Sequence, residues 1–219
     1  MRQLLLDLIP DTPPTLENFV AGSNADALTA LAAWLAADSR ETCLFFWGES
    51  GAGKSHLLSA LDADYADAAT DPLLATVPST TDFLAVDNVE ALAADGQIAL
   101  FNHFNRLRAN GGRLLAAAAQ PPVQLELRED LRTRLGSGLI YRLRPLSDDE
   151  RAAALASQAA QRGMNLSPEA LDYLLARAPR DMRSLAALLA ALDRHSLEHK
   201  RPLTLPLLRE VLRAPALQD

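Results

Sequence analysis

Residues 48–55 read GESGAGKS and match the pattern G-x-x-x-x-G-K-[ST] in full. An apolar run at residues 42–47 (TCLFFW) precedes the match, and a helix is predicted from Lys54 to about Leu61. In a strand, glycine-rich turn and helix of this kind, backbone N–H groups surround phosphate oxygens and the helix N-terminus adds a favourable dipole. The stretch therefore predicts a phosphate-binding loop in an α/β domain. A glycine-rich turn without a ligand is the simpler alternative.

The loop carries the side chains that nucleotide phosphates need. Lys54 is placed to reach the β- and γ-phosphates, and Ser55 is placed to hold Mg²⁺ through its hydroxyl. The other loop positions that we predict to bind the nucleotide are Gly48, Gly51, Ala52 and Gly53. Such a loop also needs an acid at the end of a neighbouring strand, and Asp87 follows the apolar run at residues 83–86. We therefore predict that Ser55 and Asp87 hold the metal ion.

The residue after Asp87 is unusual for an active ATPase. It is Asn88, whereas vigorous ATPases of this kind carry an acid there that polarises water. An amide cannot accept a proton at neutral pH, so we expect slow hydrolysis by this chain alone. Glu90 is close in sequence, but we expect a new turn to direct it elsewhere, as a solvated charge.

Strands and helices alternate up to about residue 145. Besides the strand before the loop, strands are predicted at residues 73–77, 83–86, 114–119 and 139–143. Helices are predicted over residues 25–37, with Asn24 as the N-cap, and over residues 97–109. This alternation predicts a mainly parallel sheet with helices on both faces.

After Pro145 the pattern predicts helices only. A capping box, Ser147 with Glu150, opens the first of them, and Ser167-Pro168 precedes the second. The remaining predicted helices cover residues 181–199 and 204–213. We therefore divide the chain into a proline-rich leader at residues 1–14, an α/β domain at 15–145 and a small helical domain at 146–219.

Composition excludes several classes of protein. The 219 residues are 49% hydrophobic and carry a net charge of −7, which is ordinary for a globular protein and unlike a disordered one. The longest uncharged stretch, residues 114–125, is too short to cross a bilayer. The single cysteine, Cys43, fits a reducing compartment. Only three of the 21 basic residues precede residue 101, whereas 15 of the 28 acidic ones do, so the two ends should face different partners.

Several segments together resemble a known family. Residues 15–24 (TLENFVAGSN), with the phosphate loop continuing into SHLL, resemble the AAA+ module of the bacterial replication initiator DnaA. The Asp87-Asn88 pair and residues 143–148 and 180–185 resemble the Hda group of that family, short relatives that inactivate DnaA. The resemblance covers about residues 15–213. It implies a P-loop core followed by a helical lid, ADP or ATP as the nucleotide, and a cytoplasmic location.

The resemblance also implies roles for single residues. Arg134, in the segment Thr133-Arg134-Leu135, matches the arginine finger that would project toward nucleotide in a neighbouring subunit. Arg183 matches the sensor 2 arginine that contacts the nucleotide from the lid, and Val20 lies where the family's N-terminal linker meets the adenine. His56 joins the nucleotide-binding set as part of the loop motif. Arg132, one position off the pattern, is expected to be an ordinary surface residue.

The leader resembles the peptide with which Hda proteins dock onto the sliding clamp of DNA polymerase. Its residues in that match are Gln3, Leu4, Leu6 and Leu8. A glutamine followed by alternating leucines suits hydrogen bonding beside an apolar groove. The alternative is a frayed terminus with stray leucines, although exposing several of them without a partner would be costly.

Three features depart from the family pattern. Residues 116–119 are all alanine where the strand should end in a polar sensor 1 residue, so intrinsic turnover should be very low. Only residues 78–82 separate the strands predicted at 73–77 and 83–86, which is too short for a parallel crossover. We therefore expect an edge strand that is irregular or pairs differently, and no DNA-melting insertion. Gly136 and Gly138 are expected to leave the finger mobile.

The resemblance thus implies an Hda-like regulator of replication initiation that binds nucleotide and the sliding clamp. Through Arg134 it would stimulate hydrolysis of ATP held by DnaA and so prevent re-initiation, with little direct DNA binding. One alternative is an autonomous P-loop ATPase or kinase. Another is a DNA-binding initiator or helicase loader, which the absence of a helix-turn-helix unit after the lid disfavours. Assembly into a homo-oligomer is left open.

Overall fold

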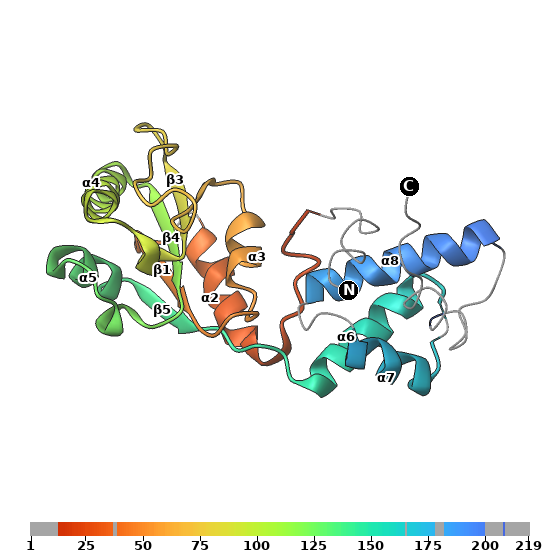
Figure 1. Ribbon diagram of the computed structural model, residues 1–219. Coiled ribbons are helices and arrows are strands. Elements are labelled where there is room, and N and C mark those ends of the chain that lie inside the picture. The colour runs from red at the N-terminus through yellow and green to blue at the C-terminus, as the bar shows by residue number, and fades with distance from the viewer. Residues whose placement is uncertain (1–12, 37–38, 165, 178–181, 200–207, 209–219) are drawn as a thin grey trace. The chain divides into compact units, whose positions relative to one another are not determined.

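The structure is a computed structural model that describes residues 13–36, 39–164, 166–177, 182–199 and 208 (Figure 1). The chain divides between Pro145 and Leu146. Residues 14–145 form an α/β unit, and the residues after Pro145 belong to a helical unit. Among the described residues, no helix is long and apolar enough to span a membrane.

The α/β unit is built on a sheet of five parallel strands in the order β2-β3-β4-β1-β5. The strands are β1 (Cys43–Trp47), β2 (Asp64–Asp67), β3 (Phe83–Asp87), β4 (Arg113–Ala118) and β5 (Leu139–Arg142). The three inner strands are almost wholly buried, as expected for a parallel sheet covered on both faces. The predicted fold class is therefore confirmed.

Helices cover the two faces of this sheet (Figure 1). One face packs on α2 (Ala25–Leu35) and α3 (Lys54–Ser59), with Leu44 and Phe46 of β1 pointing into that layer. The other face packs on α4 (Ala94–Asn110) and α5 (Glu129–Gly136), with Phe45 between them and the sheet. Three short 3-10 turns complete the unit: η1 (Gly22–Asn24), η2 (Val89–Ala91) and η3 (Pro122–Gln124).

The second strand is not where the sequence pattern predicted it. The apolar residues 73–77 form turns, and the strand is the polar segment Asp64–Asp67. An edge strand pairs on one side only, so its residues need not be apolar, and of these four only Ala66 is buried. Leu74, with φ +54°, instead enters the core from a turn. The crossover from β2 to β3 spans residues 68–82, which is long enough for a parallel connection, so the expected shortage of chain was wrong.

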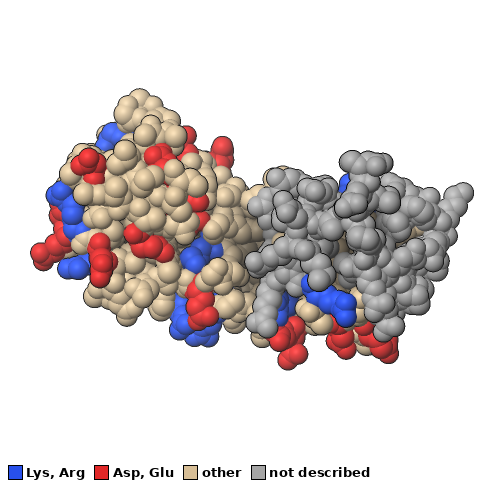
Figure 2. Space-filling model, viewed as in Figure 1, with Lys and Arg blue, Asp and Glu red and all other residues tan. Residues whose placement is uncertain are grey.

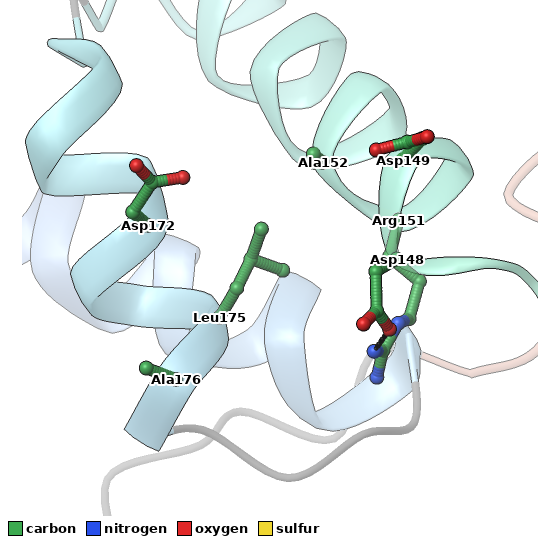
Figure 3. Close-up of a pocket in the computed structure, with 7 residues that line it drawn as sticks. All are labelled: Asp148, Asp149, Arg151, Ala152, Asp172, Leu175 and Ala176. Atoms are coloured by element: carbon green, nitrogen blue, oxygen red, sulfur yellow. Dashed lines mark hydrogen bonds and ion pairs between the residues drawn. The ribbon is translucent and has the colours of Figure 1, made fainter.

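The helical unit contains α6 (Asp148–Gln161), α7 (Pro168–Arg177) and α8 (Met182–His199). The predicted capping box is confirmed, with Glu150 N donating to Ser147 Oγ and Ser147 N donating to Glu150. Leucines from all three helices and Leu208 form its core. Apart from Leu208, the helix predicted over residues 204–213 lies outside the described residues. Figure 3 shows an open pocket of about 390 Å³ between α6 and α7, where Arg151 pairs with Asp148.

Candidate functional site

The phosphate loop joins the carboxyl end of β1 to the first residue of α3. Gly48 approaches the residue directly after β5 so closely that an added Cβ would lie 2.1 Å from the carbonyl oxygen of Leu143. Gly53, directly before α3, has φ +91°, a left-handed conformation that suits only glycine without strain. Two of the loop glycines are therefore required by the fold itself.

Lys54 closes this loop with its side chain. Its Nζ donates to the carbonyl oxygens of Gly48 at 2.6 Å and Glu49 at 3.0 Å. Burial lowers the pKa of Lys54, and the negative charges of Asp87 and Glu90 oppose that shift. The ammonium group therefore lies partly removed from water, within the field of two carboxylates. Phosphate oxygens would complete its hydrogen bonding in a way that carbonyl dipoles alone do not.

Asp87 ends β3 as a buried carboxylate, with only 1% of its surface exposed. Its oxygens accept hydrogen bonds from the backbone N–H of Asn88 at 2.9 Å and from the Tyr65 hydroxyl at 3.4 Å. Burial, together with the charges of Asp87 and Asp67, raises the pKa of Tyr65 to about 12. Tyr65 and Asp67 belong to β2. The sequence reasoning missed both because it assigned this strand to residues 73–77.

Asn88 is directed toward the edge of the sheet. Its backbone is left-handed, with φ +51°, and its Nδ2 donates to Asp67 Oδ1 at 2.8 Å. Because Asp67 and Asp87 are register partners on β2 and β3, this bond ties the ends of the two strands together. The Asn88 amide therefore serves as a structural link between the two strands.

Glu90 occupies a position that the sequence did not predict. Strand β4 lies between β1 and β3, so its carboxyl end separates the phosphate loop from Asp87. Turn η2 brings Glu90 back to this end, where its Oε1 accepts a hydrogen bond from Ala119 N at 2.9 Å. Glu90 is exposed, as expected for a solvated charge, but the expectation that the turn directs it away from this end of the sheet was wrong. No local pattern could have revealed the contact, because it joins residues 29 apart through the order of the strands.

The described part of the N-terminal segment lies against the loop. His56 contacts the carbonyl oxygen of Thr15 through Nε2 at 2.9 Å, and Val20 is half-buried. Asn24 lies at the N-cap position of α2, as predicted, but its side chain bonds to the backbone of Arg144 and not to the helix. A long-range pair of hydrogen bonds replaces the local one.

Arg134 lies on α5 and is half-buried, with its guanidinium carbon 5.9 Å from the centre of the Phe104 ring on α4. The carbonyl of Arg134 accepts a hydrogen bond from Ser137 Oγ. Gly138 has a packing reason to be glycine, because a Cβ there would lie 2.3 Å from the Cys43 carbonyl oxygen. Gly138 therefore serves the join between α5 and β5, whereas a Cβ at Gly136 would meet nothing within 4 Å.

Two groups of predicted site residues are not described by the structure at side-chain level. Arg183 lies in the first turn of α8, in the helical unit, with only its backbone described. The leader residues Gln3, Leu4, Leu6 and Leu8 lie outside the described residues.

Known families match both parts of the chain. The family model for the bacterial DnaA ATPase domain matches residues 11–77, and the model for the Hda lid domain matches residues 148–212. Domain III of Thermotoga maritima DnaA is similar in structure, with a TM-score of 0.70 and 22% identity over 94% of this chain and 97% of that one. AMPPCP-bound DnaA from Aquifex aeolicus has a TM-score of 0.65 and 22% identity, with 85% of this chain and 69% of that one covered. A variant of RuvB from Thermotoga maritima has a TM-score of 0.62 and 15% identity, with 94% of this chain and 72% of that one covered.

The sheet order, the phosphate loop and the separate helical unit define an AAA+ protein, the fold that DnaA and RuvB share. Within this class, residues 11–77 match the DnaA ATPase domain and residues 148–212 match the Hda lid. The chain thus has the AAA+ fold, a segment that matches the DnaA ATPase domain and a segment that matches the Hda lid, and these matches support an Hda-like, DnaA-related protein.

Proposed function

We propose that the protein binds ADP or ATP through residues 48–56. The fit of the loop supports this, since Gly53 is left-handed before α3 and the Lys54 ammonium is already within the loop. The Aquifex aeolicus relative binds AMPPCP. Within the described residues, no group of three or more His, Cys, Asp or Glu side chains could hold a metal. Mg²⁺ would therefore arrive with the phosphates and be held by Ser55 and Asp87.

Its own catalysis would be weak. The amide of Asn88 is bonded to Asp67, and the end of β4 offers alanines where a polar side chain would orient water. The chain keeps the residues for holding phosphates, but neither the Asn88 amide nor the alanines at the end of β4 can act as a base. A bound nucleotide would then act mainly as a structural ligand, with Val20 and Arg183 as further proposed contacts.

The proposed activity is directed at a partner. Arg134 would enter the nucleotide site of DnaA and stabilise charge on the γ-phosphoryl group while water adds to phosphorus and the bond to the bridging oxygen breaks. The observation that carries this proposal is the environment of Arg134. None of the three ion pairs among the described residues involves it, and Phe104 packs beside it. A guanidinium without an acid partner remains free to bind phosphate.

The leader would bring the protein to DNA that has just been replicated, by docking Gln3, Leu4, Leu6 and Leu8 onto the sliding clamp. Hydrolysis of ATP on DnaA at that place would prevent re-initiation. We propose little direct DNA binding by this protein. Assembly into a homo-oligomer would be compatible with this role at the clamp. In Figure 2, acidic and basic side chains lie beside each other on the described part of the visible face, without a continuous basic patch.

The test is a measurement of ATP hydrolysis by DnaA with DNA-loaded clamp. The wild-type protein should accelerate it, and Arg134→Ala should reduce the acceleration about a hundredfold or more. A chain lacking residues 2–8 should lose the acceleration at low concentration and regain part of it at high concentration. Arg132→Ala on the same helix is the matched control. If Arg134→Ala behaves like the wild type, the finger assignment is wrong.

A second candidate function is autonomous ATP hydrolysis, and the position of Glu90 favours it. This carboxylate lies at the end of β4 and acts electrostatically on Lys54, so a water beside the γ-phosphate could be within its reach. Turnover by the isolated protein that both Lys54→Ala and Glu90→Gln abolish would support this candidate. Undetectable turnover in the wild type would exclude it.

A further inference from the structure

Tyr65 lies on the edge strand beside the acid that ends β3. It belongs to β2, whose only neighbour in the sheet is β3. The next residue, Ala66, is buried in the layer that α4 and α5 cover. Because successive side chains of a strand point to opposite faces, Tyr65 points to the face that α3 covers. The phenol ring is therefore on the same side of the sheet as the helix that follows the phosphate loop.

The Tyr65 hydroxyl connects β3 with α3. It lies 3.4 Å from Asp87 Oδ2, and it also forms a hydrogen bond with the side chain of Ser59, the last residue of α3. Burial and the charges of Asp87 and Asp67 raise the pKa of Tyr65 to about 12, so the phenol keeps its proton near neutral pH. The hydroxyl therefore donates to Asp87 and accepts from Ser59.

These contacts leave Asp87 able to bind a further group. Its Oδ1 accepts from the backbone N–H of Asn88 at 2.9 Å, and Tyr65 supplies its only side-chain hydrogen bond within the described part of the chain. Each carboxylate oxygen can accept more than one bond, so both oxygens keep capacity for a metal ion or a metal-bound water. On α3, Ser59 lies four residues after Ser55 and thus on the same face of the helix. The Tyr65 hydroxyl therefore lies on the side of the two residues proposed to hold Mg²⁺.

We infer that Tyr65 is a positioning residue that orients the Asp87 carboxylate toward the Mg²⁺ ion bound with the nucleotide. The inference rests on the proposed nucleotide binding and extends that site to β2, a strand outside the phosphate loop. Groups that hydrogen-bond to a metal ligand fix its orientation and commonly set the affinity for the metal. Without the hydroxyl, Asp87 Oδ2 would lose the bond that fixes the carboxylate, whereas Lys54 and the loop glycines would still meet the phosphates.

The inference predicts a loss of affinity that depends on the metal ion. AMPPCP, whose β- and γ-phosphates are joined by a methylene group, would be titrated calorimetrically in Mg²⁺ and again in EDTA. Tyr65→Phe removes the hydroxyl and keeps the ring. It should lower the affinity about fivefold in Mg²⁺ and leave it unchanged in EDTA, as the loss of one hydrogen bond to a metal-binding carboxylate implies. Ser59→Ala should act in the same direction by a smaller factor, and it provides a second variant should Tyr65→Phe not fold.

The controls separate this inference from the proposed function. Tyr141→Phe, the same change on β5 at the opposite edge of the sheet, should leave both affinities unchanged. If the wild type does not bind AMPPCP in either condition, the proposed nucleotide binding fails and the inference fails with it. If the wild type binds equally well in Mg²⁺ and in EDTA, nucleotide binding stands and the inference is overturned. A Tyr65→Phe variant that matches the wild type in Mg²⁺, or that weakens binding equally in both conditions, also overturns it.

Discussion

Two regions of the α/β unit differ in the groups they offer to a nucleotide. The loop after β1 has phosphate-binding groups, whereas the carboxyl ends of β3 and β4 offer few groups that could activate water. After β1, the loop has its left-handed Gly53 and a lysine within its fold. After β3, the residue that follows Asp87 is Asn88, an amide that bonds to Asp67. Strand β4 ends in alanines, which offer no polar side chain. Binding groups and catalytic groups lie on different strands, so one set can be lost while the other stays. This separation is what a protein needs if nucleotide is its ligand and its partner's ATP is the substrate.

The largest expected effect concerns the β1 side. Gly48→Ala places a Cβ 2.1 Å from the Leu143 carbonyl oxygen, and backbone on both sides must move. We expect a loss of about 4 kcal/mol in the free energy of unfolding, measured by urea denaturation. Gly51→Ala is the matched control, because φ is +81° there but nothing lies within 4 Å. It should cost about 1 kcal/mol. Equal costs for the two would show that the loop is not held by this contact.

Lys54→Ala separates binding from folding on the same side. We expect nucleotide affinity to fall at least about a hundredfold, or about 3 kcal/mol, because charge-assisted bonds to phosphate are lost. The stability of the unliganded protein should hardly change, because burial opposes the charged form of Lys54 and lowers its pKa. Calorimetry with ADP measures the first quantity, and thermal melting without nucleotide measures the second. A large drop in melting temperature would assign Lys54 a structural role instead.

On the β3 side, replacing Asn88 with an acid should destabilise the protein. Asn88→Asp removes the donor to Asp67 and sets a carboxylate beside Asp67 and Asp87, so we expect about 2 kcal/mol of destabilisation at pH 7. Neighbouring negative charges raise the pKa of the introduced acid. A group whose pKa is raised by folding loses its stabilising contribution as pH rises, so stability should recover on acidification between about pH 6 and 4. Urea denaturation at several pH values, with the wild type as reference, measures this. Stability that is equal to wild type at pH 7 would contradict the structural role of Asn88.

The two sides also differ in what the sequence could predict. The loop, β1, β3 and Asp87 follow from local patterns, since a run of apolar residues and a motif of fixed spacing each lie within a few positions. Strand β2 could not be found this way, because its four residues are polar apart from Ala66 and gain their place only by pairing with β3 at the edge of the sheet. The bonds of Asn24 to Arg144 and of Glu90 to Ala119 join residues 120 and 29 apart, so strand order and not sequence spacing creates them.

The smallest expected effect concerns Glu90, which connects the two sides. Removing its bond to Ala119 N by Glu90→Ala should cost about 1 kcal/mol of unfolding free energy, because the carboxylate is exposed and water replaces part of the contact. Glu90→Gln keeps an acceptor for Ala119 N and removes the charge, so it should cost less. Without that charge, the pKa of Lys54 loses one of the two interactions that raise it. Denaturation of both variants measures the difference. If the two variants are equally destabilised, the charge facing Lys54 and not the hydrogen bond to β4 gives Glu90 its stabilising role.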